Sequence, residues 1–123
     1  MPFRDVPTHL RDIQEAIDHI NEFVGDMEFE AYQSDLKTKS AVERQLQIVT
    51  EAAIRLGEDD GPRLIGPEWR GYCNMGNIIR HAYHRVDDKI IWNTVKTELP
   101  GLRAIVQKVL AVPTADQPGP SLG

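Results

Sequence analysis

The chain shows helical spacing of its apolar residues near its start. Between residues 7 and 24, apolar side chains recur every three or four positions, at Leu10, Ile13, Ile17, Ile20 and Val24. One face of an α-helix has this period. Pro7 suits the first turn, because the amide hydrogen that proline lacks has no helical partner there. Gly25 suits the C-terminal stop. The pattern predicts an amphipathic helix over residues 7–24.

A second long helix is predicted to end at Leu56, after a short helical segment within residues 26–36. Two starts stay open for the long helix. Ser40 could cap it, with Glu43 as the capping-box partner, or it could begin earlier, near Asp35. Either start leaves one apolar stripe, formed by Val42, Leu46, Val49, Ala53 and Leu56. The glycines and prolines that follow, GEDDGPRLIGPEWRG, favour a long connection rather than a tight turn.

The second half of the chain predicts two further helices and a short last one. Pro67 precedes a helix over about residues 68–84. The next helix covers residues 87–99, with apolar positions at Ile90, Ile91, Val95 and Leu99. Pro100 is expected to break or bend it, because proline removes a helical hydrogen bond. The segment GLRAIVQKVL then forms a short C-terminal helix.

No stretch alternates with the period of a β-strand. We therefore expect an all-α fold, an up-and-down bundle of four main helices with a short extra C-terminal helix. Residues 1–111 are expected to form one domain. Residues 112–123 include three prolines and are expected to be a disordered tail.

Composition narrows the classes of function. The net charge of −5 argues against a broad nucleic-acid surface, which is usually basic, but leaves room for a small local site. No apolar run approaches the roughly 20 residues that cross a membrane, and the charged first residues lack a signal-peptide core. We expect a cytoplasmic protein without a membrane segment. The single cysteine, Cys73, excludes an internal disulfide framework and a multi-cysteine zinc site.

The stretch NMGNIIRHAYHR, residues 74–85, has one apolar and one polar face when placed on a helix. The apolar face consists of Met75, Ile78, Ile79 and Ala82, and the polar face of Asn77, Arg80, His81 and His84. Gly76 and Tyr83 lie together on one flank. The polar groups suit proton transfer and anion binding, although a solvated surface has the same pattern. A metal site is disfavoured, because His81 and His84 supply only two ligands.

The run EWRGYCNMGNIIRHAYHRVDDKIIWNTVKTELPGLRAIVQKVL resembles the C-terminal half of the HepT-like branch of the HEPN superfamily. The earlier segments HLRDIQEAIDHINEFV and AVERQLQIVTEAAIRLG are similar to its first two long helices, so the likeness covers about residues 3–110. The family motif is an arginine, four residues of which the first is polar, a histidine, any residue and a tyrosine. On this chain the polar residue is Asn77, the histidine is His81 and the tyrosine is Tyr83, whereas Gly76 occupies the arginine position.

The resemblance implies a function as well as a fold. HepT-like proteins are all-helical homodimers whose motif helices face each other and form a composite ribonuclease site that needs no metal or other cofactor. They are the toxins of toxin–antitoxin pairs. The partner is a small MNT-type nucleotidyltransferase, which can add AMP to the motif tyrosine, here Tyr83. The implied catalytic residues are His81 and Asn77, with Arg80 as a candidate cation.

Gly76 leaves three explanations open. Arg80, one turn further along, could supply the missing charge. The chain could be an inactive relative, a helical dimer that only binds a nucleotidyltransferase partner. The glycine could also be an altered position, selected because the active toxin harms its host. Under the family reading, an arginine at position 76 is expected to raise ribonuclease activity and to firm the helix. A stand-alone structural protein fits the composition but leaves the polar face unexplained.

Overall fold

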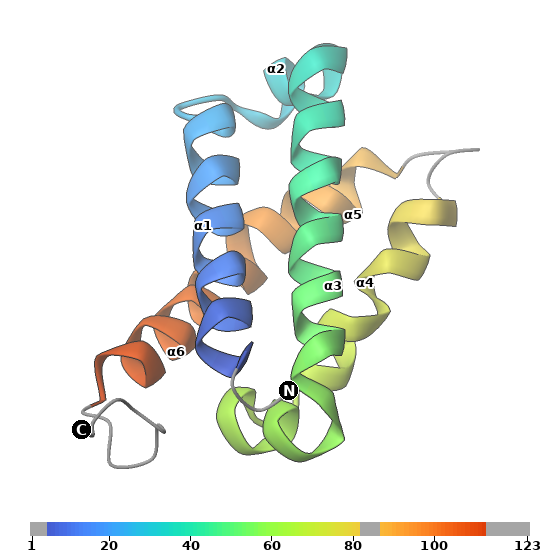
Figure 1. Ribbon diagram of the computed structural model, residues 1–123. Helices are drawn as coiled ribbons and strands as arrows, with labels where there is room; N and C mark the ends of the chain where they lie inside the picture. The colour runs from blue at the N-terminus through green and yellow to red at the C-terminus, as the bar shows by residue number, and fades with distance from the viewer. Residues whose placement is uncertain (1–4, 82–86, 113–123) are drawn as a thin grey trace.

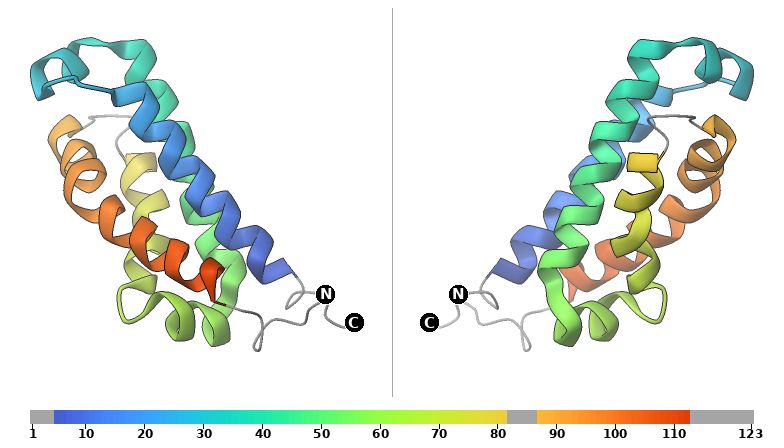
Figure 2. Two further views of the ribbon diagram at one scale, coloured as in Figure 1. Left: turned by 90° about the vertical axis from the view of Figure 1, so that its left-hand side faces the viewer. Right: turned by 90° about the vertical axis from the view of Figure 1, so that its right-hand side faces the viewer.

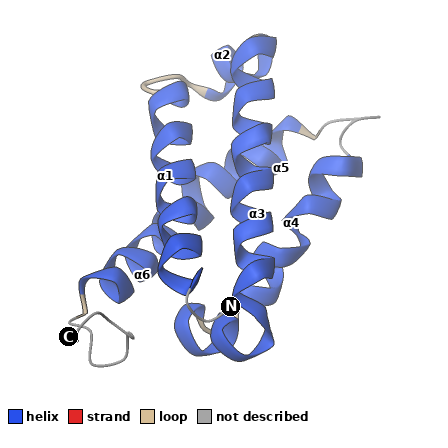
Figure 3. Ribbon diagram, in the orientation of Figure 1, coloured by secondary structure: helices blue, strands red, loops and turns tan. Residues whose placement is uncertain are grey.

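The computed structural model describes residues 5–81 and 87–112, and nearly all of them are helical. No strand occurs within these two ranges (Figure 3), and the predicted all-α fold is confirmed. In chain order the elements are α1 (Val6–Val24), α2 (Phe29–Ser34), α3 (Leu36–Ile65), α4 (Trp69–His81), α5 (Asp88–Asn93), the π-helical turn η2 (Thr94–Glu98) and α6 (Leu99–Ala111).

The helices pack in two layers around one core. Helices α1 and α3 lie side by side along their lengths (Figure 1), and α4 and α6 pack against them. Seen from the side, α1 and α3 form one layer, and α4 with the rod of α5, η2 and α6 forms the other (Figure 2). The predicted stripe of α1 is buried as expected, at Leu10, Ile13, Ile17, Ile20 and Val24. None of the helices in the described ranges is long and apolar enough to cross a membrane.

Helix α3 begins at Leu36, and its cap is Asp35. The Asp35 side chain accepts a hydrogen bond from the backbone nitrogen of Thr38 at 3.0 Å, which satisfies one of the free amides of the first turn. The earlier of the two predicted starts is therefore correct. The alternative capping box is wrong, because Ser40 and Glu43 both lie inside the helix.

The predicted connection after Leu56 is wrong in its conformation. Gly57 breaks the helical geometry, with φ 83° and ψ 172°, and this left-handed φ favours glycine. Residues 58–65 then continue as a second helical arm. Glu58, Asp59 and Asp60 stand at its N-terminal end, where acidic side chains interact favourably with the helix dipole. Gly57 thus marks a kink between two helical arms, and only residues 66–68 connect the second arm to the next helix.

The chain does not break at Pro100, although a break was one of the two outcomes expected there. Helix α5, η2 and α6 follow one another without a gap. In a regular α-helix the ring of Pro100 would clash with the carbonyl group of Lys96. The wider π-helical turn of residues 94–98 comes directly before this proline, and such turns accommodate local strain without ending a helix. Of the two predicted outcomes, a break is therefore not observed, because the chain stays helical through the π-helical turn. The last helix, Leu99–Ala111, is longer than expected.

The third predicted helix is observed as α4, which begins at Trp69 and is described to His81. Residues 82–86 lie outside the described part of the chain, so the predicted extension to His84 does too. The same holds for most of the predicted tail, since residues 113–123 are not described.

Candidate functional site

Helix α4 carries the candidate catalytic motif, and its apolar face fixes its position. Trp69, Tyr72, Met75 and Ile79 are all buried. These positions are three or four residues apart, so they form one stripe that packs against α3. The predicted apolar face at Met75 and Ile79 is confirmed, and it leaves the opposite face of α4 turned away from α3.

Trp69 anchors the start of α4 to the kink in α3. Its indole Nε1 donates a hydrogen bond to the carbonyl oxygen of Ala53 at 2.8 Å. Ala53 lies in the last turn before Gly57, where helix carbonyl groups lose their regular partners. The indole also lies against Gly61, where an added Cβ would overlap the ring. The glycine of the second arm therefore provides the space that Trp69 occupies.

Thr50 of α3 contacts α4 at Tyr72 and lies beside Gly76. It is buried, and its hydroxyl donates to the carbonyl oxygen of Tyr72 at 3.1 Å. A Cβ placed on Gly76 would lie 3.2 Å from the Thr50 Cγ2 methyl, tighter than an ordinary contact. Gly76 is buried itself, so the position where the family motif has arginine faces α3 and not solvent. Thr50 was not predicted as a site residue from the sequence, although it is a polar residue directly beside Val49 of the apolar stripe of α3.

Three of the predicted site residues lie close together along α4. Asn77 is exposed, which agrees with its place on the polar face. Arg80 and His81 follow in the last turn, one helical turn from Asn77 along the backbone. Tyr83 and His84 lie outside the described residues. The backbone thus places Asn77, Arg80 and His81 on consecutive turns of one helix.

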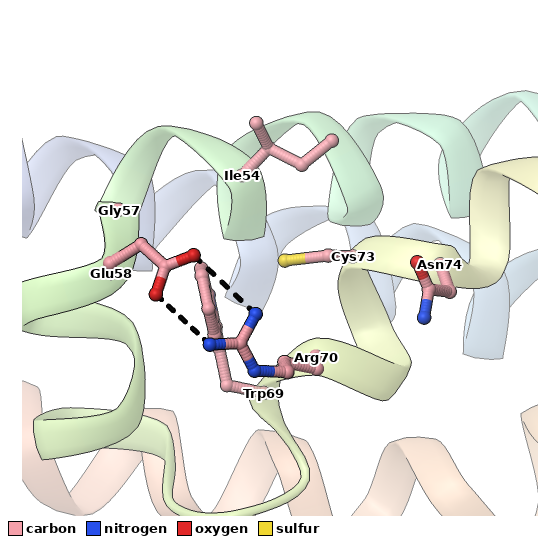
Figure 4. A pocket seen from close by; sticks show the side chains of 7 residues that line it. All are labelled: Ile54, Gly57, Glu58, Trp69, Arg70, Cys73 and Asn74. Atoms are coloured by element: carbon pink, nitrogen blue, oxygen red, sulfur yellow. Dashed lines mark hydrogen bonds and ion pairs between the residues drawn. The ribbon is translucent and has the colours of Figure 1, made fainter.

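An open pocket lies between α3 and α4, on the N-terminal side of the motif. Its volume is about 370 Å³, and Figure 4 shows the residues that line it: Ile54, Gly57, Glu58, Trp69, Arg70, Cys73 and Asn74. The Arg70 guanidinium and the Glu58 carboxylate point toward each other, with N–O distances of 3.0 and 3.4 Å. Arg70 also lies over the Trp69 indole, with its Cζ 5.5 Å from the ring centroid. Burial raises the pKa of the Cys73 thiol, which favours the protonated form.

A second polar cluster fastens the start of α5 to α3. The Lys39 Nζ lies 3.2 Å from Asp88 Oδ2, and both side chains are largely buried. Burial, followed by the negative charge of Asp88, raises the pKa of Glu43. Burial raises the pKa of Tyr32 as well, with Glu43 and Asp88 adding to the effect. Asp88 follows the motif in the chain, and its ion pair with Lys39 joins the start of α5 to α3. No periodic pattern in the sequence predicts the pairing of Lys39 with Asp88.

Metal ligands do not gather among the described residues. In the ranges 5–81 and 87–112, no group of three or more His, Cys, Asp or Glu side chains is arranged to hold an ion.

Comparison with known proteins identifies the family. The model of the Ribonuclease HepT-like family matches residues 13–109, which is most of the chain. The chain belongs to the HepT-like ribonuclease family. The earlier resemblance to HepT-like proteins of the HEPN superfamily is thereby confirmed. No solved structure is significantly similar to this chain.

Individual relatives cover most of this HepT-like chain. A protein of Thermococcus cleftensis named "Probable ribonuclease HepT" is 38% identical over 103 residues, which cover 82% of this chain and 92% of that protein. "Putative RNase MJ0127" of Methanocaldococcus jannaschii is 34% identical over 100 residues, covering 81% of this chain and 83% of that protein. The matched segments make up most of each relative, so the likeness concerns most of the helical domain.

Proposed function

We propose that this HepT-like protein is a metal-independent endoribonuclease, the toxin of a toxin–antitoxin pair, whose site is completed by a second copy of the chain. Family membership supports the ribonuclease class. The observation that carries the proposal is the arrangement of α4: Asn77, Arg80 and His81 occupy consecutive turns, and the opposite face of the helix is buried against α3. A two-fold axis beside this face would bring two sets of these residues together.

His81 is the proposed acid and base. RNA cleavage without a metal begins when a base takes the proton of a ribose 2′-hydroxyl. The 2′-oxygen then attacks the adjacent phosphorus, and the bond from phosphorus to the 5′-oxygen breaks. An acid returns a proton to that leaving oxygen, so the products are a 2′,3′-cyclic phosphate and a 5′-hydroxyl. Two histidines, one from each copy, can fill both roles because imidazole titrates near neutral pH.

Arg80 is the proposed cation for the negative charge that develops on the phosphate oxygens. An arginine offers two parallel N–H donors to such oxygens. In this chain the family position for arginine is occupied by Gly76, which is buried against Thr50. Arg80 is the nearest arginine on α4, one turn further along. Asn77 lies between these positions, where its amide can hold a phosphate or ribose oxygen.

The missing motif arginine also favours a second candidate function. A chain that has lost its transition-state cation could persist as an inactive helical dimer that binds an MNT-type nucleotidyltransferase. Both candidates keep the same fold, the same dimer and the same partner, and they differ only in RNA cleavage. Tyr83 is the proposed site of AMP addition in either case.

The test is cleavage of RNA by the purified protein in the presence of a metal chelator. The toxin proposal expects cleavage that His81→Ala abolishes, while both proteins stay folded. His19→Ala is the matched control, because His19 is an exposed histidine on α1, away from the motif. Light scattering at micromolar concentration should report a dimer for all three proteins. Absence of cleavage by a folded dimer would make the inactive partner-binding module the better account, and a strict monomer would contradict both candidates.

A further inference from the structure

The polar face of α4 extends beyond the motif toward the start of the helix. Arg70, Cys73 and Asn74 precede Asn77 by seven, four and three positions, spacings that place all four on one side of a helix. Arg70, Asn74 and Asn77 are exposed. The pocket between α3 and α4 lies at the N-terminal end of this face. The same helix face thus leads from the pocket to the candidate catalytic turn.

The Arg70 guanidinium has two partners at this pocket. Glu58 binds it through two oxygens, and Trp69 lies beneath it at 5.5 Å. Trp69 is fixed in turn by its hydrogen bond to Ala53 and by its contact with Gly61. The Arg70 side chain is nevertheless 68% exposed. The planar guanidinium of Arg70 is therefore supported by Glu58 and Trp69, and much of its surface is still accessible to solvent.

The charges at the pocket disfavour a phosphate. Glu58 offsets the charge of Arg70, and the next two residues of α3, Asp59 and Asp60, are also acidic. A neutral planar ring avoids this repulsion and can stack on a guanidinium plane, as unstacked RNA bases do in proteins. Ile54, an isoleucine that is 54% exposed, adds apolar surface beside the platform. The amide of Asn74 offers both donors and an acceptor to the edge of a base.

We propose that the pocket formed by Ile54, Glu58, Trp69, Arg70 and Asn74 is a subsite for one unpaired nucleobase of the RNA strand, stacked on Arg70. This inference rests on the proposed ribonuclease function, because it places the base next to the strand cleaved at His81. Asn74 and His81 are seven positions apart on α4, about 10 Å along the helix axis. That length corresponds to about three stacked nucleotides, and to fewer in an unstacked strand.

Binding of RNA analogues that cannot be cleaved tests the subsite. The probes are a 2′-O-methyl dinucleotide, a 2′-O-methyl hexanucleotide, and the same hexanucleotide with abasic flanks. The subsite predicts that the intact hexanucleotide binds about tenfold more tightly than the dinucleotide, since stacking of one base on a protein group contributes about this much. The abasic hexanucleotide keeps its phosphates and should lose most of the gain. Fluorescence anisotropy on labelled probes measures all three affinities.

Variants of the platform assign the gain to Arg70. Arg70→Ala should remove the advantage of the intact hexanucleotide. Arg70→Lys should fail to restore it, because lysine keeps the charge and loses the plane. Arg63→Ala is the matched control: Arg63 is likewise exposed and paired with a carboxylate, that of Asp60 at 2.7 Å, but it does not line the pocket. This control should bind all probes like the unchanged protein.

Several results would overturn the subsite. Equal binding of the intact and abasic hexanucleotides, full binding by Arg70→Lys, or no binding of any probe would each do so. A drop in molecular mass of Arg70→Ala in light scattering would also overturn it, because it would mean that a second copy of the chain covers the pocket. The ribonuclease proposal is judged separately, by cleavage of unmodified RNA and its dependence on His81. Failure of one proposal can therefore be distinguished from failure of the other.

Discussion

Thr50 of α3 holds α4 at Gly76. Its hydroxyl donates to the carbonyl oxygen of Tyr72, and its methyl group fills the space that a side chain at position 76 would need. Tyr72 and Gly76 are one helical turn apart, so a single threonine contacts α4 at both positions, at the start of the motif. The glycine that replaces the family arginine is therefore part of the packing between α3 and α4.

Gly76→Ala tests this contact. Alanine is favoured over glycine inside a helix by roughly 1 kcal/mol. Here the new methyl group would press on Thr50 Cγ2, and overpacking of a tight interior typically costs about 1–3 kcal/mol. We expect Gly76→Ala to lower the free energy of unfolding by about 1 kcal/mol. Urea denaturation at fixed protein concentration measures the change, since the stability of a dimer depends on concentration.

The matched background for that test is Thr50→Ser. Serine keeps the hydroxyl that binds the Tyr72 carbonyl oxygen and removes the Cγ2 methyl that crowds position 76. In this background Gly76→Ala should be stabilising, by about 1 kcal/mol, because only the helix propensity of alanine remains. Equal effects of Gly76→Ala in both backgrounds would contradict the crowding argument.

Arg80→Ala tests the source of the catalytic cation. If Arg80 stabilises the developing phosphate charge, its loss should reduce RNA cleavage about 10²- to 10³-fold, as for other single groups of this kind. Folding should be unaffected, so circular dichroism and light scattering of Arg80→Ala should match those of the unchanged chain. Cleavage at the original rate would remove Arg80 from the site.

Gly76→Arg is the complementary variant. The sequence alone predicts that it raises activity, but the burial of position 76 changes this expectation. An arginine there must displace Thr50 or shift α4, so we expect a loss of about 1–3 kcal/mol in stability and no gain in cleavage per folded molecule. A clear rise in cleavage with unchanged stability would show that position 76 can still carry the cation.

The sequence predicted the helices well where packing is periodic. The stripes of α1 and α3 are buried as expected, and so are Met75 and Ile79 of α4, because an amphipathic helix removes its apolar face from water by packing it against other helices. It placed an interruption at Gly57 correctly but missed the helical arm that follows, and at Pro100 a π-helical turn keeps the chain helical where a break was one of the two expected outcomes. Both outcomes depend on tertiary contacts, such as the seating of Trp69 on Gly61, that no local pattern contains.

The candidate site was predicted in part. Placing residues 74–85 on an ideal helix put Asn77 on the polar face and Met75 on the apolar face, as observed. The same placement put Gly76 on a flank, because the sequence does not show that α3 packs against that side of the helix. Thr50 and the pair of Lys39 and Asp88 were missed for the same reason: each contact joins positions at least 22 residues apart, and a single sequence carries no record of such pairs.

The pattern of tyrosine burial predicts which residue a nucleotidyltransferase modifies. The chain has three tyrosines, and two of them, Tyr32 and Tyr72, are 0% and 7% exposed. Burial also raises the pKa of both phenols, which makes the nucleophilic phenolate scarcer. We expect one AMP per chain on Tyr83 after incubation with the partner enzyme and ATP. The modification should be absent in Tyr83→Phe and present in Tyr72→Phe. Mass spectrometry of peptides locates it, and an adduct on Tyr32 or Tyr72 with Tyr83 unmodified would defeat the assignment.

Glu43 gives a prediction for the pH dependence of stability. Burial and the nearby Asp88 raise its pKa in the folded protein, and Lys39 only partly opposes them. The folded state therefore binds the proton more tightly than the unfolded state, so stability falls as pH rises from the ordinary carboxyl pKa, about 4.3, through the raised value.

Glu43→Gln removes the ionisation and keeps the size. Its free energy of unfolding should exceed that of the unchanged chain at pH 7, and the advantage should vanish below about pH 4, where glutamate is protonated in both states. Glu30→Gln, on an exposed position of α2, is the control and should show no such crossover. Urea denaturation from about pH 4 to pH 7 measures the free energy of unfolding of each protein. If Glu43→Gln were more stable by the same amount at about pH 4 and at pH 7, the charge of the Glu43 carboxylate would not be the cause of the difference.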